Sequence, residues 1–175
     1  CLPAPPCRRL RPPPSTAGRR TTPFGVEIWR GHAAVEAELA QAAGVTYLRY
    51  DLLWWDQVEL QPGVYTWPER ESREVALIAD QGMIPIAVIH NAPRWSRLVP
   101  DSGCGPVHPD ALASFAAFLF AAVSHYSQPP YYVRHYEIWN EPDAPLVPEE
   151  KGWGCWGRPE ETNWGGEAYA DLLKV

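Results

Sequence analysis

From residue 21 onward, short runs of apolar residues alternate with segments in which apolar residues recur every three or four positions. Short apolar runs are typical of strands buried on both faces of a parallel sheet, and the longer spacing is typical of helices. The runs predict four strands, at residues 24–29, 45–51, 83–90 and 133–140. The helical spacing predicts a helix after each strand, at residues 33–43, 66–81, 109–126 and 167–175.

Local signals mark the ends of the first two predicted helices. Gly44 and Gly82 follow the last apolar positions, and glycine is the usual residue just beyond a helix C-terminus because it adopts positive φ readily. Thr66 and Glu69 form the Thr-x-x-Glu pattern of a capping box, which predicts that the second helix begins at Thr66.

Long segments follow the strands, whereas short turns follow the first two helices. The long segments are rich in tryptophan, histidine and charged residues, and they cover residues 52–65, 91–107 and 141–165. In a (β/α)8 barrel the loops after the strands form the active site, and the loops after the helices serve stability. The pattern therefore predicts an α/β fold of the (β/α)8 TIM-barrel type.

Residues 21–175 supply four predicted βα units, whereas a complete barrel has eight units in about 250 residues. We therefore expect residues 21–175 to be a partial barrel, the N-terminal half of a TIM-barrel catalytic domain. A doubly wound parallel sheet is the alternative. It is less favoured because no G-x-G-x-x-G pattern follows the first strand, so nucleotide binding is unsupported.

The net charge of −6 is unevenly distributed along the chain. Residues 1–20 contain five arginines, six prolines and no acidic residue, which is typical of a disordered tail or linker. Such a basic segment could also contact phosphates or anionic lipid. The remaining residues are correspondingly acidic, which argues against a nucleic acid partner. No stretch approaches the ~20 apolar residues that a membrane span needs.

The four cysteines fall into two pairs. Cys1 and Cys7 lie in the N-terminal segment, and Cys104 and Cys155 lie in two glycine-rich loops. In an oxidising compartment a Cys104–Cys155 disulfide could join these loops, with two free thiols as the alternative. A secreted or cell-surface location would supply that compartment, and the sequence leaves localisation open. No cysteine or histidine spacing indicates a metal site, and we expect neither a metal nor a cofactor.

Residues 136–143 carry the most informative chemistry in the chain. Asn140 and Glu141 stand at the C-terminal end of the fourth predicted strand, and Pro142 ends that strand because proline cannot donate a backbone hydrogen bond. A carboxylate beside an amide and next to Trp139 is suited to proton transfer on a sugar. The alternative is a solvated loop glutamate that follows a strand.

Three segments in order resemble the clan of retaining (β/α)8 glycoside hydrolases, nearest to its family 39 and family 5 members. The first is L-R-Y-D at residues 48–51, followed by W-W and by G-V-Y-T-W at residues 63–67. The second is I-A-V-I-H-N at residues 86–91, followed by P-x-W. The third is E-I-W-N-E-P at residues 137–142, which is similar to the acid/base strand of the clan.

The resemblance implies hydrolysis of O-glycosyl bonds in a carbohydrate substrate by a retaining double displacement. It implies that Glu141 is the general acid/base, that Asn140 hydrogen-bonds the sugar 2-hydroxyl and that Arg49 helps to set the charge state of the nucleophile. In the same strand ends and loops, further substrate-binding candidates are His90, Asn91, Trp95 and Trp139. For His90 the alternative is a hydrogen bond within the core, and for each tryptophan the alternative is loop packing.

One part of the clan's site has no counterpart in the chain. The clan's nucleophile is a glutamate at the end of the seventh strand, and only four strands are predicted here. We therefore expect the 175-residue chain alone to be inactive. A non-catalytic carbohydrate-binding relative with the same barrel is the alternative function, and a glutamate at the seventh strand would favour the enzyme.

Overall fold

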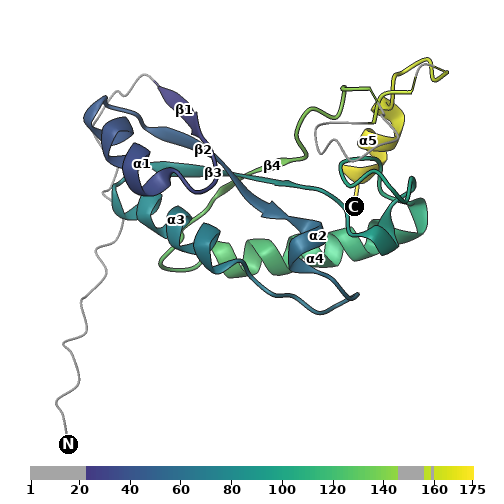
Figure 1. The fold of residues 1–175 in the computed structure, drawn as a ribbon, viewed down its shortest axis with the longest axis horizontal. Helices are drawn as coiled ribbons and strands as arrows, with labels where there is room; N and C mark the ends of the chain where they lie inside the picture. Colours follow the sequence, from purple (N-terminus) through teal and green to yellow (C-terminus); the bar gives the residue numbers. More distant parts are fainter. Residues whose placement is uncertain (1–22, 146–155, 159) are drawn as a thin grey trace, which may run out of the picture.

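The computed structural model of the protein describes residues 23–145, 156–158 and 160–175. The four predicted strands and the four predicted helices are present there, with shifted ends, and α2 is an additional helix. In chain order, the elements are β1 (Gly25–Ile28), α1 (Ala33–Ala42), β2 (Tyr47–Trp54), α2 (Trp55–Val58), α3 (Glu69–Asp80), β3 (Ile84–His90), the 3-10 turns η1 (Arg94–Ser96) and η2 (Pro109–Ala111), α4 (Leu112–Tyr126), β4 (His135–Ile138) and α5 (Gly166–Leu172) (Figure 1).

The four strands form one parallel sheet in the order β1-β2-β3-β4. Each strand therefore pairs with the next one along the chain, and the sheet grows in one direction. A doubly wound sheet reverses its direction near the first strand, as in the order 3-2-1-4. The described strands thus follow the sequential order of a barrel and not the order of the doubly wound alternative.

The two faces of the sheet differ in chemistry, because successive side chains of a strand point to opposite faces. One face carries fully buried apolar side chains, such as Leu48, Tyr50 and Ile89, which belong to the core. The opposite face carries the charged side chains of Arg49 and Asp51, which are partly exposed. The expectation of strands that are apolar on both faces is therefore wrong for this face.

The second predicted helix begins later than the capping-box pattern indicates. α3 starts at Glu69 with Pro68 at its N-cap, and no side chain caps it. Because a residue before proline is disfavoured in helical conformation, Trp67 cannot belong to the first turn. Thr66 instead donates its backbone N–H to the Val58 carbonyl. At the C-termini of α1 and α3 the prediction is confirmed, since both following glycines have positive φ.

The segment after the second predicted strand is more ordered than a loop. β2 continues to Trp54 past a register shift, and the single turn of α2 follows at once. The cause is Trp55, which is fully buried and packs against Phe115 and Phe118 of α4 with ring centroids 5.2 and 5.5 Å apart. Among the described residues, no helix has the length and apolar character that a membrane crossing requires.

Candidate functional site

A cavity of about 450 Å³ opens at the C-terminal end of the strands, on the polar face of the sheet. Four of the predicted site residues meet in its lining: Arg49, His90, Asn140 and Glu141. The other lining residues come mainly from β1, the end of β2 and the segments that follow them: Glu27, Ile28, Trp29, Arg30, Asp51, Trp54, Gln57, Arg70 and Val88.

Arg49 is the centre of a hydrogen-bonded network that joins three strands. Its Nε and Nη2 donate to the two carboxylate oxygens of Glu137 on β4, at 2.9 and 2.5 Å. Its Nη1 donates to Glu27 on β1. The hydrogen bond with Glu137 is the largest influence on the guanidinium and raises the pKa of Arg49 further. The side chain is therefore a fixed cation, held from both sides by carboxylates.

Asn140 is oriented by the same guanidinium. Nη2 of Arg49 lies 2.9 Å from Oδ1 of Asn140. Because a guanidinium can only donate, the amide oxygen must face Arg49 and the NH₂ group must point elsewhere. Within the part of the chain that the structure describes, this NH₂ group has no hydrogen-bond acceptor. It is available to donate to a hydroxyl oxygen in the cavity, as the resemblance implies for the sugar 2-hydroxyl.

His90 lies at the end of β3 with both ring nitrogens engaged. Nε2 is 2.9 Å from Oδ1 of Asp51, and Nδ1 is 3.2 Å from Oδ1 of Asn91. Trp54 donates its indole N–H to the second Asp51 oxygen at 2.8 Å. His90 is only 7% exposed, so it is held in the core and borders the cavity at the same time.

The charge state of Asp51 follows from these partners. Burial alone opposes ionisation of the carboxyl, but the hydrogen bonds from His90 and Trp54 outweigh it and hold the pKa of Asp51 below its ordinary value. Asp51 is therefore a carboxylate at neutral pH. An ionised carboxylate only accepts hydrogen bonds. Nε2 of His90 must therefore carry a proton and donate a hydrogen bond to Asp51.

Glu141 lines the cavity and is otherwise exposed. Its backbone has φ 46°, and the nearby Trp139 and Asn91 have φ 72° and 60°. Non-glycine residues rarely adopt this left-handed region, and such residues cluster at functional sites. Within the described residues, the Glu141 carboxylate forms no hydrogen bond or ion pair. It is therefore free to exchange a proton with a molecule in the cavity.

Three predicted substrate-binding residues do not line this cavity. Trp139 is 1% exposed, and its indole N–H donates to the Cys104 carbonyl at 2.7 Å. Trp95 packs edge-on against Trp55 with ring centroids 5.5 Å apart. Asn91 is buried, and its backbone carbonyl accepts the Asp56 N–H at 3.0 Å. These side chains support the loops around the cavity.

Sequence reasoning missed three carboxylates of the site: Glu27, Asp51 and Glu137. Each is a charged residue within an otherwise apolar strand, two positions away from another polar residue or the strand end. In a strand this spacing places the charges on one face. That alternation was a usable signal, but the partners of the charges depend on the pairing between strands.

The structure describes only one of the two cysteines in the expected disulfide. Cys104 is 1% exposed and is disulfide-bonded. Cys155 lies outside the described residues, so the Cys104–Cys155 pairing stays a prediction. Residues 1–20 also lie outside the described residues. Within the described part of the chain, no group of three or more His, Cys, Asp or Glu side chains is placed to hold a metal ion.

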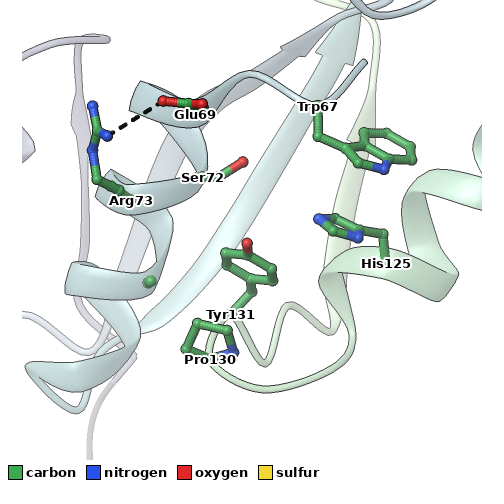
Figure 2. A pocket seen from close by; sticks show the side chains of 8 residues that line it. Trp67, Glu69, Ser72, Arg73, His125, Pro130 and Tyr131 are labelled. Atoms are coloured by element: carbon green, nitrogen blue, oxygen red, sulfur yellow. Dashed lines mark ion pairs between the residues drawn. The ribbon is translucent and has the colours of Figure 1, made fainter. Parts of the chain in front are cut away.

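A second pocket of about 380 Å³ lies between α3 and the turn that follows α4, away from Glu141. Figure 2 shows Trp67 and His125 on one side and the α3 residues Glu69, Ser72 and Arg73 on the other. The Trp67 and His125 rings stack with centroids 4.8 Å apart and an angle of 9°. A second ring, Tyr65, stacks on Trp67 at 5.8 Å. These rings cover one another and form the aromatic side of the pocket.

His125 makes the stability of this region depend on pH. Burial lowers the pKa of His125 below its ordinary value of about 6.5, so the unfolded chain binds a proton more readily than the folded one. Stability from this group is complete above the unfolded pKa and is lost as pH falls through the folded pKa. We expect the free energy of unfolding, measured in urea, to fall between pH 7.5 and 5, and to fall less in His125→Phe.

The control for this experiment is His32→Gln, because the His32 side chain is 61% exposed and its ion pair with Glu36 is a surface pair that contributes little to stability. We expect this variant to keep the pH dependence of the wild type. An unchanged pH dependence in His125→Phe would contradict the assignment.

Comparison with solved structures finds glycoside hydrolases. The chain is similar to a family 39 glycoside hydrolase from Bacteroides cellulosilyticus, with 24% identity and a TM-score of 0.63 over 87% of this chain and 28% of that one. It is similar to a family 30 subfamily 8 xylanase from Clostridium acetobutylicum, with 20% identity and a TM-score of 0.59 over 87% of this chain and 38% of that one. It is also similar to an exo-β-1,4-mannosidase from an Opitutaceae bacterium, with 19% identity and a TM-score of 0.56 over 74% of this chain and 27% of that one.

No protein-family model matches the chain, and no curated protein matches it in sequence. The likeness to the solved structures therefore concerns the fold. At that level it confirms the resemblance to barrel glycoside hydrolases that the sequence motifs indicate. The chain spans 28% of the length of the family 39 protein.

Proposed function

We propose that the chain supplies the N-terminal half of the catalytic barrel of a retaining glycoside hydrolase. In this proposal Glu141 is the general acid/base, and Asn140, Arg49 and His90 form the part of the sugar-binding site that the first four strands contribute. The observation that carries the proposal is the Glu141 carboxylate in the lining of a polar cavity, with no partner among the described residues and directly beside an amide whose NH₂ group faces away from Arg49.

The chemistry of glycoside hydrolysis requires this combination. One carboxyl group protonates the leaving oxygen, and in a retaining enzyme a second carboxylate about 5–5.5 Å away attacks the sugar. Glu141 has the exposure and the freedom that a proton donor needs. Glu27 and Glu137 are both bound to Arg49, so neither is a free nucleophile. The nucleophile in this proposal comes from a strand beyond the four described here.

The flanks of the described sheet fit a partial barrel. In the sheet, β1 and β4 each have a neighbour on one side only. The helices that follow the sheet's first and third strands carry exposed apolar side chains: Val35 and Leu39 on α1 are 70% and 67% exposed, and Phe120 on α4 is 77% exposed. Large exposed apolar groups commonly mark surfaces that another element covers. Further βα units on both flanks would cover them.

Turnover of aryl β-glycosides tests the function. We expect a full-length parent with eight βα units to hydrolyse one of a panel of 4-nitrophenyl β-D-glycosides, and NMR of the first product to show a retained anomeric configuration. We expect the 175-residue chain to show no turnover, because in this proposal the second carboxylate comes from a strand beyond the four described.

Two results would contradict the proposal. Inversion at the anomeric carbon would exclude the double displacement. Robust turnover by the 175-residue chain that Glu141→Gln abolishes would show that the four units already contain the nucleophile. Sugar binding without turnover in the full-length parent would favour the non-catalytic carbohydrate-binding alternative.

A further inference from the structure

We infer that Glu137 is a positioning residue, which acts through Arg49 to hold the amide of Asn140 with its NH₂ group available to substrate. The inference rests on the proposed glycosidase function, in which Asn140 donates to a sugar hydroxyl. Neither the residues of the E-I-W-N-E-P segment nor the likeness to solved structures assigns Glu137 this role. Its basis is a chain of contacts from Glu137 through Arg49 to Asn140.

The first step is the reach of Arg49 across the sheet. Arg49 lies on β2 and Glu137 on β4, and β3 runs between them. Neighbouring strands are about 4.8 Å apart, so the two backbones are separated by roughly 10 Å and only a long side chain can join them. The residues of β3 that pair with Arg49 and Glu137 are Ile86 and Val88, whose aliphatic side chains cannot compete for the guanidinium.

The second step is a nitrogen atom that two acceptors share. Nη2 of Arg49 donates to Oε1 of Glu137 at 2.5 Å and to Oδ1 of Asn140 at 2.9 Å. Nε donates to the other Glu137 oxygen, so the pair is bidentate and fixes the plane of the guanidinium. The position of Nη2 is thus set by Glu137, and Nη2 in turn sets the orientation of the Asn140 amide.

Glu27 provides an internal comparison. It binds the same guanidinium, but through Nη1, which does not contact Asn140. Its side chain is 49% exposed and that of Glu137 is 39% exposed, so the two carboxylates lie in similar surroundings. Loss of Glu27 leaves the bidentate pair intact. Loss of Glu137 leaves Arg49 bound to Glu27 alone, and the guanidinium is then free to turn away from Asn140.

The same contacts change the role of Arg49. The resemblance implies that Arg49 helps to keep the nucleophile ionised. In the structure, two carboxylates already surround its single positive charge, and four of the five N–H donors of an arginine are engaged. Its field on a further carboxylate is therefore largely compensated. Arg49 acts mainly by fixing hydrogen-bond geometry.

Nuclear magnetic resonance of the 175-residue chain tests the positioning directly. The Nε–H signal of Arg49 is assigned by its loss in Arg49→Lys, and the side-chain NH₂ signals of Asn140 by their loss in Asn140→Asp. In Glu137→Gln we expect the Asn140 signals to shift and the exchange of the Arg49 Nε–H with water to accelerate about tenfold. In Glu27→Gln, which leaves the Nε and Nη2 contacts in place, we expect both changes to be much smaller. Equal effects of the two variants would overturn the inference.

Kinetics of the full-length parent test the consequence for substrate. The measured quantity is the ratio of kcat/KM for a 4-nitrophenyl β-D-glycoside to kcat/KM for its 2-deoxy analogue. We expect Glu137→Gln to lower this ratio roughly tenfold and Glu27→Gln, which removes no partner of Nη2, to lower it much less. Glu137→Asp keeps the negative charge, and we expect its kcat/KM ratio to be close to that of the wild type. A general loss of stability would lower activity on both substrates without changing the ratio.

The two experiments separate the possible failures. An active parent whose ratio does not respond to Glu137→Gln would overturn the positioning role and leave the proposed function standing. A parent with no glycosidase activity would refute the proposed function, and the magnetic resonance comparison would still decide whether Glu137 holds Arg49 and Asn140.

Discussion

Replacing Glu141 with alanine in the full-length parent is expected to lower kcat/KM for an alkyl β-glycoside by about 10²–10⁴, the usual contribution of a general acid. An alkoxide is a poor leaving group and needs a proton, which Glu141 donates in the proposed mechanism. A 2,4-dinitrophenolate leaves without protonation, so kcat/KM for the corresponding aryl glycoside is expected to fall much less. The measurement is a comparison of the two substrates in wild type and variant.

A second nucleophile extends this test. In the proposed double displacement, loss of Glu141 leaves no general base to activate water in the second step, whereas azide is already anionic and needs no base. Azide is therefore expected to raise kcat of Glu141→Ala on the dinitrophenyl substrate and to yield a glycosyl azide. Glu160→Ala, an exposed glutamate that does not line the cavity, is the control and is expected to behave as the wild type. Equal losses on both substrates would contradict the acid/base role.

Replacing Trp55 with alanine is expected to lower the free energy of unfolding by about 3–5 kcal/mol, the usual cost of removing a large aromatic group from a core. Trp55 has no exposed surface and contacts Trp95, Phe115 and Phe118. Its indole N–H also donates to the Glu59 carboxylate at 2.5 Å. The alanine variant therefore leaves a cavity, and it leaves the buried Glu59 carboxylate with the Gly63 N–H but without its indole donor. Urea unfolding measures the change.

Two further variants set the scale for Trp55. Trp55→Phe keeps much of the ring packing and loses the hydrogen bond to Glu59, so its expected cost is smaller than that of alanine. Leu60→Ala changes a side chain that is 74% exposed, and a change within about 0.5 kcal/mol is expected. A Trp55→Ala variant as stable as Leu60→Ala would show that the core assigned to this region is wrong.

The Trp55 result bears on what the sequence could predict. In the sequence, Trp54 and Trp55 stand in a segment predicted as a loop, where stacking on sugars and packing within the loop are equally good readings of a tryptophan. The structure separates the neighbours: Trp54 borders the cavity and Trp55 fills the core. A register shift in β2 and the turn of α2 send the two rings in different directions. These features depend on the packing of α4, which is distant in the sequence.

In the candidate site too, some features follow from the local sequence and others depend on the tertiary structure. The position of Asn140 and Glu141 at a strand end follows from a short apolar run and a proline, which are local signals. The role of Glu137 does not follow from local signals, although Glu137 lies in the same motif. Its partner Arg49 is 88 residues away in the chain, and the two side chains meet only because parallel pairing sets Arg49 opposite Ile86 and Glu137 opposite Val88 on β3.

By itself, the sequence determined the kinds and order of the elements, the turns at Gly44 and Gly82 and the strand-end carboxylate, because spacing, proline and glycine act on neighbouring residues. Only the tertiary structure decided which charges neutralise each other and which aromatic rings are buried. It placed Arg49 between Glu27 and Glu137 and put Trp139 in the core. Those outcomes depend on the register between strands and on helix packing, which no local pattern encodes.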